Sequence, residues 1–528
     1  MGCIEGTDGG WDGAVPYVMA NPMAAPNVFA PRMRAVRLLG EEGMQKVVAA
    51  QEPGGSGDIY EGLNEDQKQA LKEATSMGFP PKAWFDYPYM GDGALMVLVP
   101  AVYQMFPTYF KDFWEKEGYE GADPESNEAR AHMKLVTTVE HLDYDYAEPE
   151  LSEEEKNTVD TSWLNTILGG EKLPHIYLKD AIPADTYTYH CRFKVLDGAC
   201  AGKEINISSI DGNMLELHPE NDGKHENPFK ELKPGDQVMI DNGDAIAMQC
   251  FHRHQLPDET YDVYDQFRNE DGSPKYTQLP MLVAPMTAIS GAGLMPTGNI
   301  HGKVIGICSM MDESACPWHG DWYRKAIGRC GIDEQDHFRL YYHDNSIHDD
   351  RAGYLDDPQN QVDYLGTLHQ ALLDVAAWCE KGIEPFDTMN YTYADGQITL
   401  PKGAKERGGM QPVVSAVVEN AAGQSDYDGK VTRAKVGENV CFKAVIEVPP
   451  KAGKVTHAAW DYEKTNDWSN DEVIEAVDDT TYKIEADHVF TKPGIYYPVI
   501  KVASNRHGDA GDIFTQCKSL DRVKVIVE

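Results

Sequence analysis

An aspartate and a histidine that each follow a short apolar run are the residues of this chain best suited to acid–base chemistry. Asp312 comes after the run at 304–308, and His348 lies in a polar loop after the run at 338–342. Imidazole can take a proton from a nucleophile and return it to a leaving group, while a buried carboxylate orients the ring and stabilises its cation. We therefore predict that Asp312 and His348 are the acid and the base of a catalytic triad.

Two buried parallel strands with a helix between them would have to position this pair. Both runs are apolar without alternation, which is typical of strands covered on both faces of a parallel sheet. A helix is expected between them at about 317–329. Parallel strands bring their carboxyl ends to one edge of a sheet, where α/β proteins place their sites. The same pattern also fits an ordinary strand–helix–strand unit with acidic loops and no chemistry.

The nucleophile of such a triad is not evident, because the chain contains no complete Gly-x-Ser-x-Gly motif. Ser56 comes nearest, in the segment PGGSGD at 53–58. Asp58 stands where the final glycine belongs, and the segment follows a helix-like stretch rather than a strand. A tight loop therefore explains this segment better, and Ser56 is kept as a weak alternative nucleophile.

The first residues predict that the chain starts inside a domain. Residues 3–5, followed by glycine-rich residues 6–10, resemble the end of a strand that enters a loop, with nothing before it to pair with. We expect Glu5, Asp8 and Trp11 to line the rim of the site, although an ordinary glycine-rich loop fits equally well. On this interpretation the first strands and the nucleophile are missing from the chain.

The composition indicates a soluble protein of several domains. The 528 residues suffice for two to four domains, and 41% of them are apolar. Asp and Glu outnumber Lys and Arg by 86 to 47, which argues against nucleic acid or anionic membranes as partners. No membrane span or signal peptide is evident. Ten cysteines are too few for a disulfide scaffold, although Cys441 and Cys517 could pair in an exported protein.

The pattern of the chain divides it into four parts. Residues 1–170 are expected to form a partial α/β core and a helical cap, and residues 171–260, with short alternating runs and glycine turns, a small inserted β-barrel. Residues 261–405 return to the α/β core and carry the proposed acid and histidine. Residues 406–528 have strands at the spacing of a β-sandwich.

Several elements outside the proposed site are also predicted. Helices are expected at 64–77, where a capping box begins the pattern, and at 361–380. A basic amphipathic helix is expected at 27–39, with Arg32 and Arg34 on its polar side. The acidic run at 144–160 is interpreted as a solvated linker or helix face.

Two histidines offer a different kind of site. His252 and His254 are two positions apart and would share one face of a strand, as two ligands of a metal ion can. No third ligand is evident nearby, so we predict neither a metal nor another cofactor.

The last part of the chain resembles a polycystic-kidney-disease (PKD) domain, an immunoglobulin-like β-sandwich. The resemblance depends on the segment WDY at 460–462 and the segment HVFTKPGIY at 488–496. Such domains are usually extracellular spacers or binding modules attached to enzymes, and this resemblance implies the same role here.

Residues 1–405 resemble large bacterial α/β-hydrolase-like proteins, with a layout similar to the tannase and feruloyl-esterase branch. The segments that carry the resemblance include GTDGGWDGAVPYVMANP, EPGGSGDIYEGLN, GFPPKAWF, CFHRHQLP and YDQFRNEDG. The resemblance implies an α/β-hydrolase-like parallel sheet, only partly present here, with Asp312 as its acid and His348 as its histidine. It also implies a secreted or periplasmic protein, although the chain carries no signal peptide.

Three functions follow from these observations. The first is a serine-hydrolase-type esterase that acts on a small-molecule or glycan ester and lacks its nucleophile in this chain. The second is a non-enzymatic extracellular binding or adhesion protein on a degenerate hydrolase scaffold. The third is a metal-dependent hydrolase that uses His252 and His254. The sequence does not predict the oligomeric state.

Overall fold

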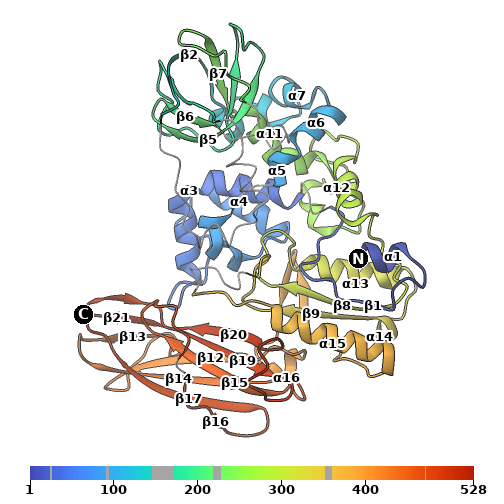
Figure 1. Ribbon diagram of the computed structural model, residues 1–528, viewed down its shortest axis with the longest axis vertical. Helices are drawn as coiled ribbons and strands as arrows, with labels where there is room; N and C mark the ends of the chain where they lie inside the picture. The colour runs from blue at the N-terminus through green and yellow to red at the C-terminus, as the bar shows by residue number, and fades with distance from the viewer. Residues whose placement is uncertain (24–26, 91–93, 146–171, 218–226, 351–358, 470) are drawn as a thin grey trace. The chain divides into compact units, whose positions relative to one another are not determined.

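The computed structural model describes the chain except for residues 24–26, 91–93, 146–171, 218–226, 351–358 and 470 (Figure 1). The described chain forms two compact units. Unit 1 comprises Met1–Gly91, Leu256–Ser273 and Met281–Glu528, and unit 2 comprises Asp92–Gln255 and Pro274–Pro280. Most of the predicted acidic linker at 144–160 lies outside the described residues.

A three-stranded parallel sheet lies at the centre of unit 1. It has the order β1 (Gly13–Ala14), β8 (Lys303–Ser309) and β9 (Phe338–His343). All residues of β8 except the first, and all of β9, are buried, as the two unbroken apolar runs require. The parallel pairing predicted for these runs is confirmed.

Helices cover the two faces of this sheet. The connection from β8 to β9 contains α13 (Trp318–Arg329) and the short α14 (Glu334–His337), and α15 (Leu365–Lys381) follows β9. In Figure 1, α13 lies above the sheet and α15 below it. α15 ends where Gly382 takes the left-handed conformation, with φ of 65°.

The start of the chain differs from the prediction. Residues 2–6 form a short helix, α1 (Gly2–Gly6), rather than the end of a strand. Its amide groups at Ile4 and Glu5 donate to the carbonyl of Met1, and the Ile4 side chain is fully buried. A helix satisfies these backbone groups locally, because no strand is paired with this segment.

Two longer helices follow, α3 (Phe29–Gln51), which bends at Gly40, and α4 (Glu65–Ser76). The predicted capping box at the start of α4 is present. The predicted exposure of Arg32 and Arg34 is wrong, since both are almost fully buried. Arg32 donates to the carbonyl of Glu313, and Arg34 forms an ion pair with Glu73.

The remaining described elements of unit 1 outside its C-terminal part are short. They are η1 (Pro81–Tyr89), η4 (Asp262–Phe267), α12 (Val283–Ala292), the hairpin of β10 (Thr392–Ala394) and β11 (Gln397–Thr399), and α16 (Ala404–Arg407).

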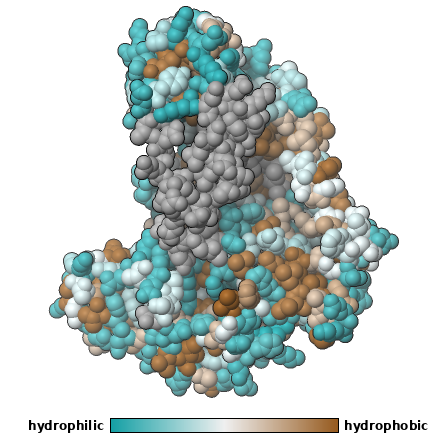
Figure 2. All heavy atoms as spheres, viewed as in Figure 1, coloured by the Kyte–Doolittle hydropathy of each residue, from teal (hydrophilic) through white to brown (hydrophobic). Residues whose placement is uncertain are grey.

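Unit 2 contains a closed antiparallel barrel of six strands with the order β2-β3-β6-β5-β4-β7. The strands are β2 (Lys134–Asp143), β3 (His175–Leu178), β4 (Arg192–Val195), β5 (Glu204–Asp211), β6 (Met214–Leu217) and β7 (Gln237–Asp241). Alternating residues such as Phe193, Leu215 and Ile240 fill the barrel, while the face drawn at the top of Figure 2 is mainly hydrophilic. The predicted barrel is confirmed, and β2 adds a strand from before its expected start.

The helical part of unit 2 contains α5 (Ala94–Val97), α6 (Val99–Met105), α7 (Tyr109–Glu115), η2 (Glu120–Ala122), α8 (Asn127–Ala131), α11 (Gly243–Cys250) and η3 (Phe251–His254). His252 and His254 therefore lie in a 3₁₀ helix, and their predicted placement on a strand is wrong. The ring of His254 packs instead among buried aromatic side chains, including Tyr109 and Phe113.

The C-terminal β region, residues 413–527, consists of ten strands in three sheets with the orders β12-β14-β17-β16, β13-β21-β18 and β15-β19-β20. The strands are β12 (Val413–Asn420), β13 (Val431–Ala434), β14 (Asn439–Glu447), β15 (Lys454–Asp461), β16 (Glu475–Ala476), β17 (Thr481–Val489), β18 (Gly494–Tyr496), β19 (Val499–Asn505), β20 (Cys517–Arg522) and β21 (Lys524–Val527). Phe442, Trp460 and Val525, one from each sheet, share a single buried core. The region is all-β, as predicted.

Two further observations concern the cysteines and the helices. All ten cysteines are free, so Cys441 in β14 and Cys517 in β20 do not form the disulfide considered from the sequence. None of the described helices is long and apolar enough to cross a lipid bilayer.

Candidate functional site

Asp312 and His348 lie side by side at the carboxyl ends of β8 and β9. The Nδ1 atom of His348 is 3.0 Å from Oδ1 and 3.2 Å from Oδ2 of Asp312. Asp312 is fully buried, whereas 36% of the His348 side chain is exposed. The carboxylate therefore accepts the Nδ1 proton of a ring that is itself open to solvent.

The loop after β8 fixes the direction of the Asp312 carboxylate. Its Oδ1 atom accepts hydrogen bonds from the backbone amides of Ser314 at 2.9 Å and Ala315 at 2.6 Å. The amide of Met311 donates to the carbonyl of Ser346 at 2.8 Å, which joins the acid loop to the histidine loop. These bonds orient the carboxylate before any substrate is present.

The Asp312 carboxylate controls the charge of the imidazole. Burial disfavours the cation, but the hydrogen bond and the negative charge of Asp312, together with Glu313 and Asp349, raise the pKa of His348 to about 9. The ring is therefore mainly a cation at neutral pH. Above this pKa the ring is neutral and its Nε2 becomes a proton acceptor.

Glu313 adds a second carboxylate beside this pair. The backbone amide of His348 donates to its Oε2 atom at 3.4 Å. Burial and the adjacent charge of Asp312 raise the pKa of Glu313, which Arg32 opposes. This role of Arg32 was not predicted from the sequence, because its position in a basic amphipathic pattern placed it on the polar side of the helix.

Two tyrosines border the histidine. The hydroxyl of Tyr364 donates to the carbonyl of His348 at 3.1 Å, and its ring lies 5.7 Å from the ring of Tyr17. Tyr17 extends the β1 edge by a parallel bridge to Ile307 and is half exposed. The next residue, Val18, has φ of 42°, which β-branched residues rarely adopt and which costs about 1–3 kcal/mol.

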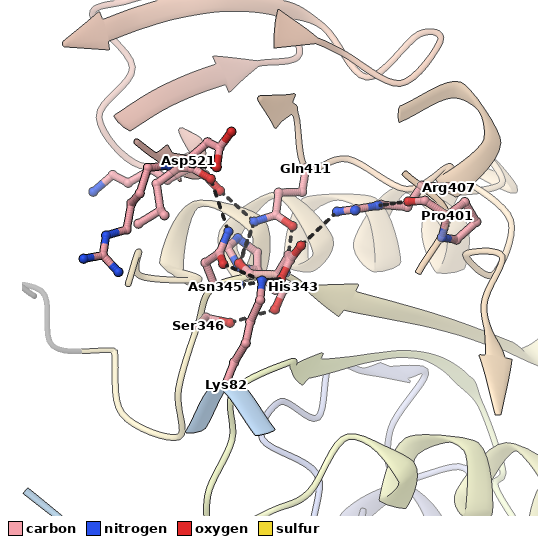
Figure 3. A network of polar contacts seen from close by, with 12 residues as sticks. Lys82, His343, Asn345, Ser346, Pro401, Arg407, Gln411 and Asp521 are labelled. Carbon is pink, nitrogen blue, oxygen red and sulfur yellow. Dashed lines mark hydrogen bonds and ion pairs between the residues drawn. The ribbon is translucent and has the colours of Figure 1, made fainter. Parts of the chain in front are cut away.

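The other histidine of this loop, His343, has a structural environment. It is buried at the end of β9, and Nε2 of Gln411 contacts its Nδ1 at 3.2 Å (Figure 3). Burial lowers its pKa to about 4, so the ring is neutral at pH 7. His348 is thus the histidine of this loop that contacts Asp312.

A polar network around His343 anchors the end of β9 to the C-terminal β region (Figure 3). The amide nitrogen of Gln411 also donates to the carbonyls of Asp344 and Lys518. The carboxylate of Asp344 pairs with Lys82 and Arg407, and these cations lower its pKa in spite of burial. The loop that carries His348 therefore begins at a fixed position.

The other residues predicted for the site lie in different surroundings. Both oxygens of Glu5 are occupied, by the hydroxyl of Tyr323 at 2.6 Å and by groups of Thr297 and Gly298. Asp8 and Trp11 are exposed. Ser56 lies in a turn, where its hydroxyl accepts from the amide of Asp58. Among the described residues, no hydrogen bond joins any of these four to Asp312 or His348.

The Nε2 atom of His348 has no hydrogen-bond partner within the part of the chain that the structure describes, so no serine, threonine or cysteine there is paired with it. The described residues also contain no group of three potential metal ligands. His254 instead contacts the Thr277 carbonyl through Nδ1 and Glu120 through Nε2. The arrangement can orient and charge an imidazole, and any acyl transfer needs a nucleophile from elsewhere.

Comparisons with known proteins add little to this geometry. No protein-family model and no curated protein matches the chain. Among solved structures the chain is similar to an engineered protein, with 10% sequence identity and a TM-score of 0.14. The match covers 47% of this chain and 43% of that chain, so the chain spans less than half the length of that protein. This likeness carries no argument about fold or function.

Proposed function

We propose that the protein is a serine-hydrolase-type esterase in which His348 is the general base and Asp312 orients it. The observation that supports this role is the hydrogen bond from Nδ1 of His348 to a buried, preoriented carboxylate. This contact fixes the tautomer that leaves Nε2 to accept a proton. At pH values above the His348 pKa of about 9, where the ring is neutral, Nε2 would take the proton from a hydroxyl nucleophile and give it to the departing alcohol.

We propose that the nucleophile comes from residues other than those the structure describes around Asp312 and His348. In the sheet order β1-β8-β9, the acid follows the middle strand and the histidine follows one outer strand. The outer edge of β1 pairs with no other described strand. A parallel strand added there would end at the same edge of the sheet as β8 and β9, from where the loop that follows it could bring a serine to Nε2.

The finer fold assignments belong to the same proposal. We assign the parallel sheet to an α/β-hydrolase-like fold and the C-terminal β region to an immunoglobulin-like sandwich of the PKD type. The position of Asp461 supports the second assignment. This buried carboxylate accepts from the amides of Thr465 and Asn466, and so fixes the loop that follows the tryptophan strand. An exported enzyme acting on small-molecule or glycan esters is consistent with such a module.

The test is to produce the protein from its complete gene and to measure hydrolysis of p-nitrophenyl butyrate and labelling by a fluorophosphonate. We expect labelling of a serine, and a loss of kcat of at least about 1,000-fold in His348→Ala. His369→Ala is the matched control, because His369 is partly exposed and its Nδ1 contacts the carbonyl of Phe514, outside the proposed site. Full activity of His348→Ala would refute the proposed role of His348.

A binding protein without catalysis is the second candidate. It is favoured by the absence of any hydroxyl or thiol paired with Nε2 among the described residues. This candidate predicts that the protein neither reacts with the fluorophosphonate nor hydrolyses the ester. Labelling of the protein at a serine would exclude it.

A further inference from the structure

A cavity in unit 1 lies apart from the residues of the proposed esterase chemistry. Its volume is about 570 Å³, and it is lined by the end of α3, the helix η1, residues 359–361 and loops of the C-terminal β region. Neither Asp312 nor His348 lines it. The volume falls in the range of about 300–1,000 Å³ that is usual for small-ligand sites.

Aromatic rings form much of the wall of this cavity. Phe85 comes from η1, and Tyr462, Tyr496 and Tyr497 come from the C-terminal β region. All four rings are partly exposed. Partly exposed rings around one cavity offer apolar faces to a ligand that also carries polar groups.

Two glutamines present acceptors that the described residues leave unsatisfied. Gln361 is 4% exposed; its Nε2 atom donates to Asp86 at 3.2 Å, and its Oε1 atom has no partner. Gln359 donates to Asp461 and Asn466, and its Oε1 atom is likewise buried without a partner. A buried carbonyl oxygen without a donor costs about 1–3 kcal/mol. Both glutamines line the cavity, where the hydroxyl groups of a ligand could supply the missing donors.

The charges at the wall are largely compensated. Arg522 pairs with Glu52 at 2.7 Å and lies over the rings of Phe85 and Tyr497, at 5.7 Å and 5.3 Å from their centroids. The Arg522 guanidinium is therefore already paired within the protein. Among the buried lining atoms without a hydrogen-bond partner, Oε2 of Glu52 and Nε of Arg522 belong to this ion pair, and the other two are the neutral oxygens Oε1 of Gln359 and Gln361. Neutral acceptors favour a neutral hydrogen-bond donor over an anion.

We propose that this cavity binds a neutral saccharide. The apolar face of a sugar ring would lie on the tyrosines, and its hydroxyls would donate to Oε1 of Gln361 and Oε1 of Gln359. A saccharide combines these two features, an apolar ring face and several neutral donors. The site is independent of the proposed esterase, although a glycan held there could carry the ester that the enzyme acts on.

The experiment is calorimetric titration of the full chain with cellohexaose, xylohexaose, mannohexaose and maltohexaose at millimolar concentration. We expect at least one hexasaccharide to bind. Gln361→Leu, which keeps the side-chain volume but removes the acceptor, and Tyr497→Ala should each weaken that binding at least about tenfold. Phe514→Ala is the matched control, because this exposed ring of the same β region does not line the cavity.

Two results would overturn the proposal: no binding of any of the four hexasaccharides, or binding that both cavity variants leave unchanged. Near-UV circular dichroism checks that each variant is folded. If one of the variants is not folded, Glu463→Ala, at an exposed position of the cavity wall, is used in its place. The titration needs no catalysis. If the protein made from its complete gene binds sugar but neither hydrolyses the ester nor reacts with the fluorophosphonate, only the esterase is refuted, and if it is active but binds no sugar, only the saccharide site is refuted.

Discussion

At the scale of single residues, the carboxylate of Asp312 determines the charge of His348. Replacing Asp312 by Asn keeps the shape but removes the negative charge, so the pKa of His348 should fall from about 9 toward the ordinary histidine value of about 6.5. An NMR titration of the imidazole resonances measures this change. Asp349→Asn is the control, since Asp349 is exposed and contributes least, and it should lower the pKa much less. An unchanged pKa in Asp312→Asn would contradict the pairing.

The same pKa has a consequence for stability. The folded-state pKa of His348 is raised above its unfolded value, so its stabilising contribution is complete below about pH 6.5 and is lost as pH rises through about 9. Because the ring is partly exposed, we expect this contribution to be only about 1 kcal/mol. Urea unfolding at pH 6 and pH 10 measures this contribution as the difference in free energy of unfolding between the protein and His348→Ala. We expect this difference to be smaller at pH 10. A larger difference in free energy of unfolding at pH 10 than at pH 6 would contradict this expectation.

The pair of Asp312 and His348 could be predicted because both residues follow strand ends, which apolar runs locate well. The residues that surround this pair could not be predicted from the sequence. Arg32 and Glu313 meet across a long sequence separation, and Tyr364 contacts the backbone of His348 from a segment that looked like the start of a packing helix. Glu5 was expected at the rim because it stands at the end of a predicted strand that enters a glycine-rich loop. Its actual partner, Tyr323, comes from a distant helix.

At the scale of elements, two helical glycines should respond oppositely to alanine. A Cβ at Gly366 in α15 would lie 1.8 Å from the carbonyl oxygen of Gln516, next to β20, whereas a Cβ at Gly328 in α13 would meet no atom within 4 Å. Gly366→Ala should therefore lower the free energy of unfolding by about 2–3 kcal/mol. Gly328→Ala should raise it by about 0.4–1 kcal/mol.

Chemical unfolding of both glycine variants compares these values with the original protein. Equal effects of the two substitutions would show that the contact between α15 and the segment before β20 does not limit stability. Gly328 is the matched control, because both glycines lie within helices and differ only in the space around them.

Elements were predictable from the sequence where their patterns were long or bounded by clear turns. The strands β8 and β9, the barrel strands β6 and β7, and the capped helix α4 are examples. Short segments failed, as α1 and η3 show, because a few residues carry no period that separates a helix from a strand. Within the region predicted as a β-sandwich, β18 and β19 are separated at Tyr497-Pro498, since proline has no amide to donate to a sheet.

At the scale of the whole molecule, the net charge of −39 should make stability depend on salt. Like charges on the folded surface repel one another, and salt screens them over a distance that falls below about 10 Å above 0.1 M. Raising NaCl from about 0.05 M to about 0.5 M should therefore raise the midpoint of thermal unfolding, by about 2–4 °C for each kcal/mol recovered. Equal molarities of KCl should act alike, and a falling midpoint would contradict the explanation.

The pairing of β1 with β8 sets an order for folding during synthesis. Gly13 meets its partner Lys303 only after roughly 300 further residues have been made, and at roughly 5–20 residues per second this takes at least about 15 seconds. All strands of the barrel in unit 2 lie between these two partners, so they are synthesised before β8. On the ribosome, the segment that becomes β1 therefore has no partner strand of its sheet until the whole barrel sequence has been made.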